Sequence, residues 1–76
     1  MHDVNLDDLM RTLELTGDVA DIDFADLGFD PAGVRALGAR LQRRYCVPVS
    51  GEDMRTTGTP RGALALVNRL LLDVAG

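Results

Sequence analysis

Apolar residues recur at the spacing of one helical face near the start of the chain. They are Leu6, Leu9, Met10 and Leu13. Asn5, just before them, is a favoured N-cap residue, and Gly17 can end a helix because glycine readily adopts the left-handed conformation. The pattern therefore predicts a first helix over about residues 6–16.

A second helix is predicted from Asp30 and Pro31 onward. Aspartate is a good N-cap, and proline is tolerated at the first helical position because its missing N–H would have no partner there. The apolar positions that follow lie within one sector of the helical wheel; they are Val34, Leu37, Gly38, Leu41 and Tyr45. Pro48 prevents the helix from continuing.

Two further segments follow this helix. Ser50 can cap a short third helix or turn. Thr59-Pro60 again places a capping residue before proline and predicts a last helix over about 60–74. Its expected core face consists of Leu64, Val67, Leu70, Leu71 and Val74. Leu66 and Leu72 lie off this face, and they either widen the core or form a contact patch for a partner.

The long connection over residues 17–30 is not a polar linker. Aspartates alternate there with apolar residues, which are Val19, Ile22, Phe24, Leu27 and Phe29. We expect the apolar side chains to fold back over the helices and the aspartates to face water. No strand alternation or repeat is present. The sequence thus predicts an all-α fold, a small four-helix bundle with a long loop between its first and second helices, in a single domain over 1–76.

Charge is divided unevenly between the two parts of the chain. Residues 1–30 carry nine acids and one arginine, whereas residues 31–76 carry seven arginines and three acids, and the net charge is −4. Phosphate would be repelled over the acidic part, which argues against nucleic-acid binding. No apolar run approaches the roughly 20 residues that span a bilayer. We expect a cytoplasmic monomer that binds no membrane.

Few residues offer independent chemistry. His2 is the only histidine and lies near the terminus, and no grouping has the spacing of a zinc site. The aspartates at 18, 21, 23 and 26 lack the ligand pattern of a calcium loop. We therefore predict no metal site and no catalytic residue. Cys46 is expected to be a small buried residue; the alternative is a reactive or acyl-accepting thiol.

Three blocks of sequence together resemble the acyl carrier protein family, and they cover nearly the whole chain. The first is Asp26-Leu27-Gly28-Phe29-Asp30. The second spans residues 39–49 and is similar to the end of the second helix in that family. The third spans 59–68 and is similar to the last helix of discrete carriers from bacterial type II polyketide synthases. The resemblance implies the four-helix bundle of the acyl-carrier-protein type.

The chain departs from this family at its functional position. In acyl carrier proteins the first block is followed by a serine that carries the 4′-phosphopantetheine arm, whereas this chain has Pro31. The resemblance therefore implies a degenerate carrier that is not phosphopantetheinylated, needs no cofactor, and acts by binding or modulating an enzyme of a polyketide or fatty-acid-type pathway. The interface candidates are Asp26, Asp30, Val34 and Arg35. Arg35 stands where a glutamate is common, so docking on basic surfaces should be poor.

Two alternatives remain. In the first alternative, the chain is an ordinary carrier of acyl thioesters on 4′-phosphopantetheine. Pro31 is then an engineered replacement of the serine, or the arm is attached elsewhere. Ser50 is the only serine, and its expected role is that of a helix cap. The other alternative is a small enzyme that uses Cys46, for which the sequence offers neither a neighbouring base nor a metal site.

Overall fold

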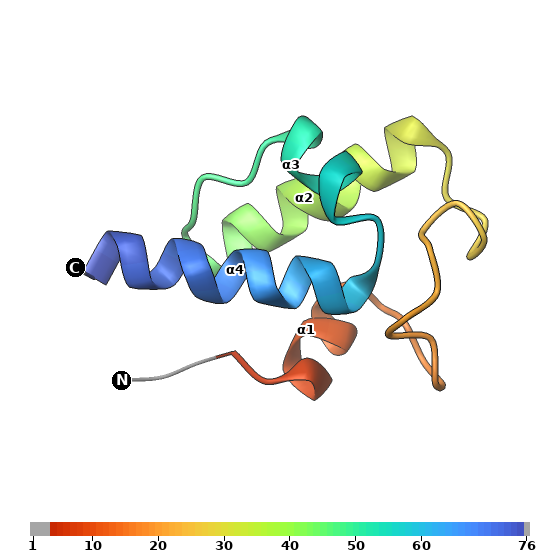
Figure 1. The fold of residues 1–76 in the computed structure, drawn as a ribbon, viewed down its shortest axis with the longest axis horizontal. Coiled ribbons are helices and arrows are strands. Elements are labelled where there is room, and N and C mark those ends of the chain that lie inside the picture. The colour runs from red at the N-terminus through yellow and green to blue at the C-terminus, as the bar shows by residue number, and fades with distance from the viewer. Residues whose placement is uncertain (1–3, 76) are drawn as a thin grey trace.

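The computed structural model describes residues 4–75, and the side chains of residues 4–73. Its helices are α1 (Leu6–Thr12), α2 (Pro31–Tyr45), α3 (Gly51–Thr57) and α4 (Pro60–Ala75). In Figure 1, α4 crosses the molecule between α1 on one side and α2 and α3 on the other. No strand occurs in residues 4–75, and no helix there is long and apolar enough to cross a membrane. The predicted all-α four-helix bundle is confirmed.

The core lies where α1, α2 and α4 meet, and α3 closes one side of it. The large side chains that are fully buried are Leu9, Leu13, Phe24, Leu41, Val47, Met54, Pro60 and Val67. No polar or charged residue is buried among those described. The core positions predicted for α2 are confirmed: Val34, Leu37, Gly38 and Leu41 are buried and Tyr45 is half-buried.

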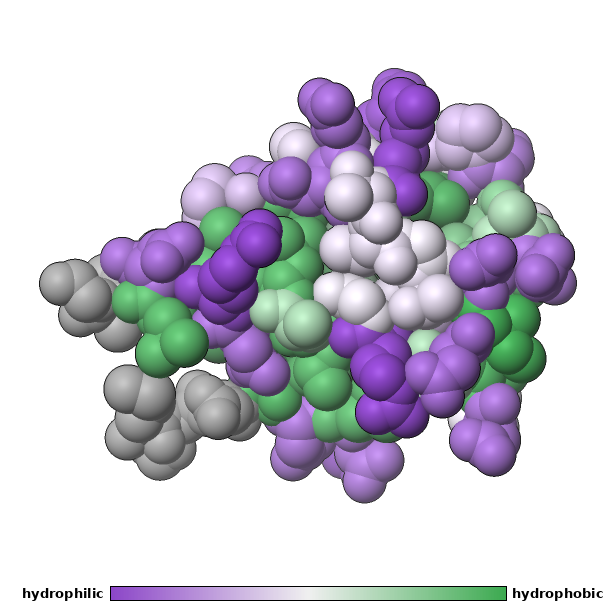
Figure 2. All heavy atoms as spheres, viewed as in Figure 1, coloured by the Kyte–Doolittle hydropathy of each residue, from purple (hydrophilic) through white to green (hydrophobic). Residues whose placement is uncertain are grey.

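The buried face of α4 differs from the predicted one. Leu66 is only 6% exposed and belongs to the core, whereas Leu72 is 49% exposed. Val67 is buried as predicted, and the other predicted positions that are described are partly buried and pack against the core; they are Leu64, Leu70 and Leu71. The side chain of Val74 lies outside the described residues. The buried sector is wide because α1, α2 and α3 all contact α4. On the face seen in Figure 2, apolar atoms reach the surface in patches between hydrophilic side chains.

Helix α1 starts at the predicted residue but ends earlier than predicted. Asn5 is its N-cap, and the Asn5 side chain accepts a hydrogen bond of 2.7 Å from the Asp8 N–H. Helix α1 ends at Thr12 because Glu14 adopts the left-handed conformation, with φ 58°. The Leu15 N–H then donates to the Met10 carbonyl and the Glu14 N–H to the Arg11 carbonyl, which is the Schellman arrangement. Gly17 does have positive φ, but it lies beyond the helix end.

The loop between α1 and α2 packs against the rest of the fold mainly through Phe24. This side chain is 2% exposed, and its ring forms a T-shaped pair with the Phe29 ring, with 6.1 Å between centroids. The Phe24 N–H donates to the Gly58 carbonyl over 2.8 Å, so the loop is joined to the turn before α4. The prediction for this loop is confirmed for Phe24 and for the exposed aspartates, but it is wrong for Ile22, which is 38% exposed.

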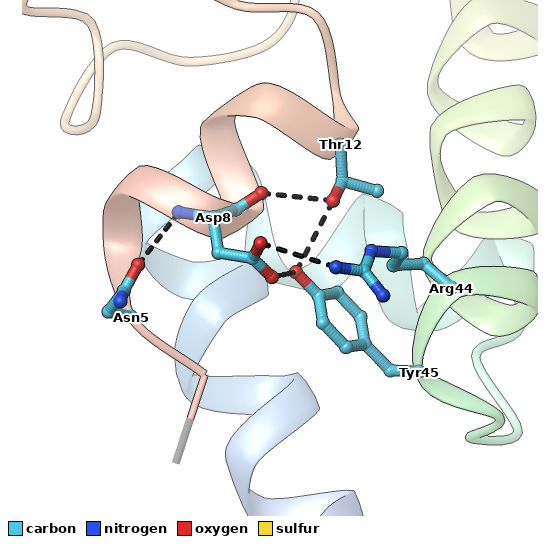
Figure 3. Close-up of polar contacts among 5 residues, drawn as sticks. All are labelled: Asn5, Asp8, Thr12, Arg44 and Tyr45. Carbon is cyan, nitrogen blue, oxygen red and sulfur yellow. Dashed lines mark hydrogen bonds and ion pairs between the residues drawn. The ribbon is translucent and has the colours of Figure 1, made fainter. Parts of the chain in front are cut away.

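A polar cluster joins α1 to the C-terminal end of α2 (Figure 3). The Tyr45 hydroxyl donates to Asp8 Oδ2 over 2.5 Å and lies 3.3 Å from the Thr12 hydroxyl. Arg44 Nη2 lies 3.4 Å from the other Asp8 oxygen. Burial raises the pKa of Tyr45, and its hydrogen bond to Asp8 raises the pKa further. The cluster therefore fixes α1 against α2 by side-chain bonds as well as by apolar contact.

Candidate functional site

The N-terminal end of α2 is built by Asp30 and Pro31. The Asp30 backbone is extended, and its Oδ1 accepts a hydrogen bond of 2.7 Å from the Gly33 N–H. This bond satisfies one of the free N–H groups that begin a helix. Pro31 is the first helical residue and is exposed. The predicted cap is thus confirmed, and position 31 presents a pyrrolidine ring, which has no nucleophilic atom, to the solvent.

An apolar cavity of about 360 Å³ lies beside Pro31. Its walls come from the α1–α2 loop, from α2 and from α3. The lining residues include Phe24, Phe29, Pro31, Val34, Met54 and Arg55. Most of these side chains are apolar, so the cavity is suited to a small apolar group. Arg55 supplies the positive charge in this lining, and Asp23 supplies a negative one.

A second, more polar pocket of about 370 Å³ is also lined by Pro31. Pro31 and Arg35 from α2 face Gly51, Glu52 and Arg55 of α3 there. The gap is narrow at Gly51, where an added Cβ would lie 3.3 Å from Arg35 Cγ. Arg35 and Arg55 therefore flank Pro31, and neither forms an ion pair with another described residue.

The structure brings together three of the four predicted interface residues. Asp30 and Arg35 are exposed near Pro31, whereas Val34 is 9% exposed and lines the apolar cavity. Asp26 is exposed on the preceding loop but lines neither pocket. Sequence reasoning missed Met54 and Arg55, because only the packing of α3 on α2 places them at this site.

Ser50 serves as the N-cap of α3. Its hydroxyl accepts a hydrogen bond of 3.0 Å from the Asp53 N–H, and Asp53 Oδ2 accepts one of 3.2 Å from the Ser50 N–H. These reciprocal bonds form a capping box. The predicted structural role of Ser50 is confirmed, and its hydroxyl is already used in capping.

Cys46 differs from the prediction that it is buried. It is exposed and follows α2 in the left-handed conformation, with φ 56°. Glycine adopts this backbone conformation readily, whereas residues with a side chain seldom do. No group of three or more metal-ligating residues occurs in residues 4–75. His2 lies outside the described residues.

The chain is similar in sequence and fold to several bacterial carrier proteins, although no known family model matches it. It is 34% identical to the actinorhodin polyketide synthase acyl carrier protein of Streptomyces coelicolor, over 91% of this chain and 92% of that protein. It is 36% identical to the tetracenomycin polyketide synthase acyl carrier protein of Streptomyces glaucescens, over 72% of this chain and 63% of that protein.

Solved structures show the same similarity. The hexanoyl form of the actinorhodin carrier protein from Streptomyces coelicolor gives a TM-score of 0.81 at 32% identity, over 93% of this chain and 94% of that one. The oxytetracycline acyl carrier protein gives a TM-score of 0.75 at 26% identity, over 97% of this chain and 88% of that one. The fold, the capped start of α2 and this similarity over nearly the whole chain establish that the protein belongs to the acyl carrier proteins of type II polyketide synthases.

Proposed function

We propose that this protein is a carrier-like protein that is not phosphopantetheinylated and that acts by binding an enzyme of a polyketide pathway. One observation carries the proposal: the first residue of α2, where this family bears its attachment serine, is Pro31. Attachment of the arm needs a hydroxyl oxygen to attack the phosphorus of coenzyme A. Proline has no such oxygen, so the residues at this position do not fit a covalently attached arm.

No other hydroxyl replaces the missing one at the start of α2. Ser50 begins a different helix, and its oxygen accepts a hydrogen bond within the α3 capping box. Modification of Ser50 would replace this bond with a bulky group at the helix start. We therefore expect neither Pro31 nor Ser50 to carry an arm.

The surface around Pro31 supports a binding role. Asp30, Pro31 and Arg35 are exposed on consecutive turns of α2, and Asp26 is exposed on the loop before it. We propose that these residues, with Val34 in the cavity wall, contact the partner enzyme. Arg35 makes the surface around Pro31 less acidic and so lowers the attraction of this surface to basic patches on a partner. We therefore expect the partner surface not to be basic.

The ordinary carrier is a second candidate because an apolar cavity lies beside Pro31. A cavity of about 360 Å³ lined by Phe24, Phe29 and Met54 could shelter an acyl chain next to an attachment point. In this case serine would be the native residue at position 31, and sequencing the native gene would establish it.

The decisive experiment measures intact mass after incubation with coenzyme A and a broad-specificity phosphopantetheinyl transferase. The native chain and Pro31→Ser are treated in parallel. We expect only Pro31→Ser to gain the mass of one arm. A gain by the native chain would overturn the proposal, and mapping the adduct would then locate the true attachment residue.

Binding is tested separately with purified polyketide synthase enzymes. The native chain should form a stable complex with one of them. The double variant Ser50→Ala/Cys46→Ser should bind equally well, because neither residue belongs to the proposed interface. If no pathway enzyme binds the native chain, the binding role is refuted even where the mass result agrees with the proposal.

A further inference from the structure

A shallow groove of about 620 Å³ lies between α1 and the C-terminal half of α2, away from Pro31. We call it the arginine groove. The charged residues that line it are Asp8, Arg11, Glu14, Arg40, Arg43 and Arg44. Thr12 completes the lining, so no apolar side chain contributes to it.

The arginine groove is positive on a protein that is negative as a whole. Four of the eight arginines of the chain line it, against two carboxylates, which gives a local charge of +2 where the chain as a whole has −4. Nine of the twelve acidic residues lie in the first 30 positions, and only Asp8 and Glu14 among them line the groove. An anionic partner would be repelled by the acidic loop between α1 and α2 and attracted to the groove, where four arginines gather.

The two carboxylates neutralise only part of the groove. Arg40 Nη1 lies 3.1 Å from Glu14 Oε1, and Arg44 Nη2 lies 3.4 Å from Asp8 Oδ1. The Arg44 guanidinium also lies 5.6 Å from the centre of the Tyr45 ring, which helps to hold it in place (Figure 3 shows Arg44, Tyr45 and Asp8). Arg11 and Arg43 form no ion pair with any described residue.

Stability of the fold does not explain this concentration of arginines. The side chains of Arg40 and Arg44 are 46% and 58% exposed, and ion pairs so exposed contribute little. The helix dipole favours a cation in the last turn of a helix, which suits Arg11 in α1 and Arg43 and Arg44 in α2. It does not favour bringing both sets to one groove, since like charges held close together repel one another.

The chemistry of the lining indicates the occupant. A guanidinium group binds a carboxylate through two parallel hydrogen bonds, and several guanidinium groups along a groove match several carboxylates along a chain. The groove is open and is lined by residues of two helices rather than enclosed, so it fits a segment of polypeptide better than one small anion. We propose that the arginine groove is a docking surface for an acidic segment of a partner protein. It is separate from the surface around Pro31 and does not depend on the function proposed for that surface.

The test uses the full chain and a capped hexaglutamate peptide as the probe. Binding is followed through the NMR signals of the arginine Nε–H groups at low and at physiological salt. We expect the signals of Arg11, Arg43 and Arg44 to shift most, and the affinity to fall as salt is added. Capped hexalysine should leave these signals unchanged.

Two charge-reversal variants distinguish attraction of the peptide to the arginine groove from attraction due to the net charge of the whole protein. Arg43→Glu and Arg69→Glu change the net charge equally, and both residues are exposed on helices without an ion pair to a described residue. We expect Arg43→Glu to weaken peptide binding by about tenfold and Arg69→Glu by less than about twofold. Circular dichroism should show that both variants fold, because neither arginine takes part in a described ion pair and the unfavourable dipole interaction of Arg43→Glu in the last turn of α2 is small.

Three results would overturn the proposal. The first is that hexaglutamate fails to bind even at low salt. The second is that Arg69→Glu weakens binding as much as Arg43→Glu, which would show that only net charge matters. The third is that inorganic phosphate saturates the same signals at lower concentration than the peptide, which would identify a site for a small anion instead.

Discussion

The hydrogen bond from Tyr45 to Asp8 offers the sharpest test of how α1 is attached. The substitution Tyr45→Phe removes the hydroxyl and keeps the ring, so the contact with Arg44 remains. Hydrogen bonds to charged groups contribute about 1.5–3 kcal/mol. Because Tyr45 is only half-buried, water reduces this value, and we expect the free energy of unfolding to fall by about 1 kcal/mol.

Thermal unfolding followed by circular dichroism measures this loss. For a domain of this size, 1 kcal/mol corresponds to a decrease in Tm of roughly 4–8 °C. Thr12→Val is the matched control, since it removes only the longer contact of 3.3 Å to the Tyr45 hydroxyl and the bond of Thr12 to the Asp8 carbonyl. If Tyr45→Phe is as stable as the native chain, the cluster in Figure 3 does not hold α1 in place.

The same bond predicts a dependence of stability on alkaline pH. Burial and the bond to Asp8 raise the pKa of Tyr45 above its ordinary value of 10.0, so the folded state retains the phenolic proton more strongly than the unfolded state. The stabilisation is therefore complete below the ordinary pKa and is lost as pH rises through the folded-state pKa. Tyr45 is the only tyrosine and the chain has no tryptophan, so its ultraviolet absorbance reports the titration directly. A midpoint at or below the ordinary pKa would refute the reasoning.

Two further substitutions test how the backbone conformation at Cys46 and the close backbone approach at Gly62 affect stability. Cys46→Gly should stabilise the protein by about 1 kcal/mol, because the left-handed conformation at φ 56° is strained for residues with a side chain; a Tm equal to or below that of the native chain would contradict this. Gly62→Ala should destabilise it by about 1–3 kcal/mol, because the new Cβ would lie 2.6 Å from the Thr57 carbonyl oxygen. Urea denaturation measures this loss, and an unchanged midpoint would mean that the α3–α4 junction relaxes freely.

The starts of the helices could be predicted from sequence, whereas one helix end could not. Asn5, Asp30 and Ser50 each cap a helix through their own side chain, and this interaction is local in sequence. The end of α1 depends instead on Glu14 taking a conformation that usually belongs to glycine. Burial of Leu13 and packing of Leu15 against the core favour this turn, and both are tertiary effects that helical periodicity does not reveal.

The candidate site shows the same limit. Position 31 could be identified from the residues around it, because its neighbours in sequence are also its neighbours in the structure. Met54 and Arg55 line the cavity beside Pro31 only because α3 packs on α2. The arginine groove likewise joins Arg11 to arginines about 30 positions later in the chain, a distance over which sequence spacing carries no information.

Proline at position 31 is compatible with the start of the helix that displays it. Proline at the first helical position has the φ angle that the helix needs and gives up an N–H that would have no partner there. Proline also lowers the conformational entropy of the unfolded chain, and serine would restore that entropy. We therefore expect Pro31→Ser to lower the free energy of unfolding by only about 0.4–1 kcal/mol. Asp30 would still cap α2 through Gly33, and Pro31→Ser should therefore fold as the native chain does. Chemical denaturation of the two proteins checks this expectation, and a much larger loss would show that Pro31 was needed for the fold. With both proteins folded alike, a difference in phosphopantetheinylation reports the single hydroxyl and nothing else.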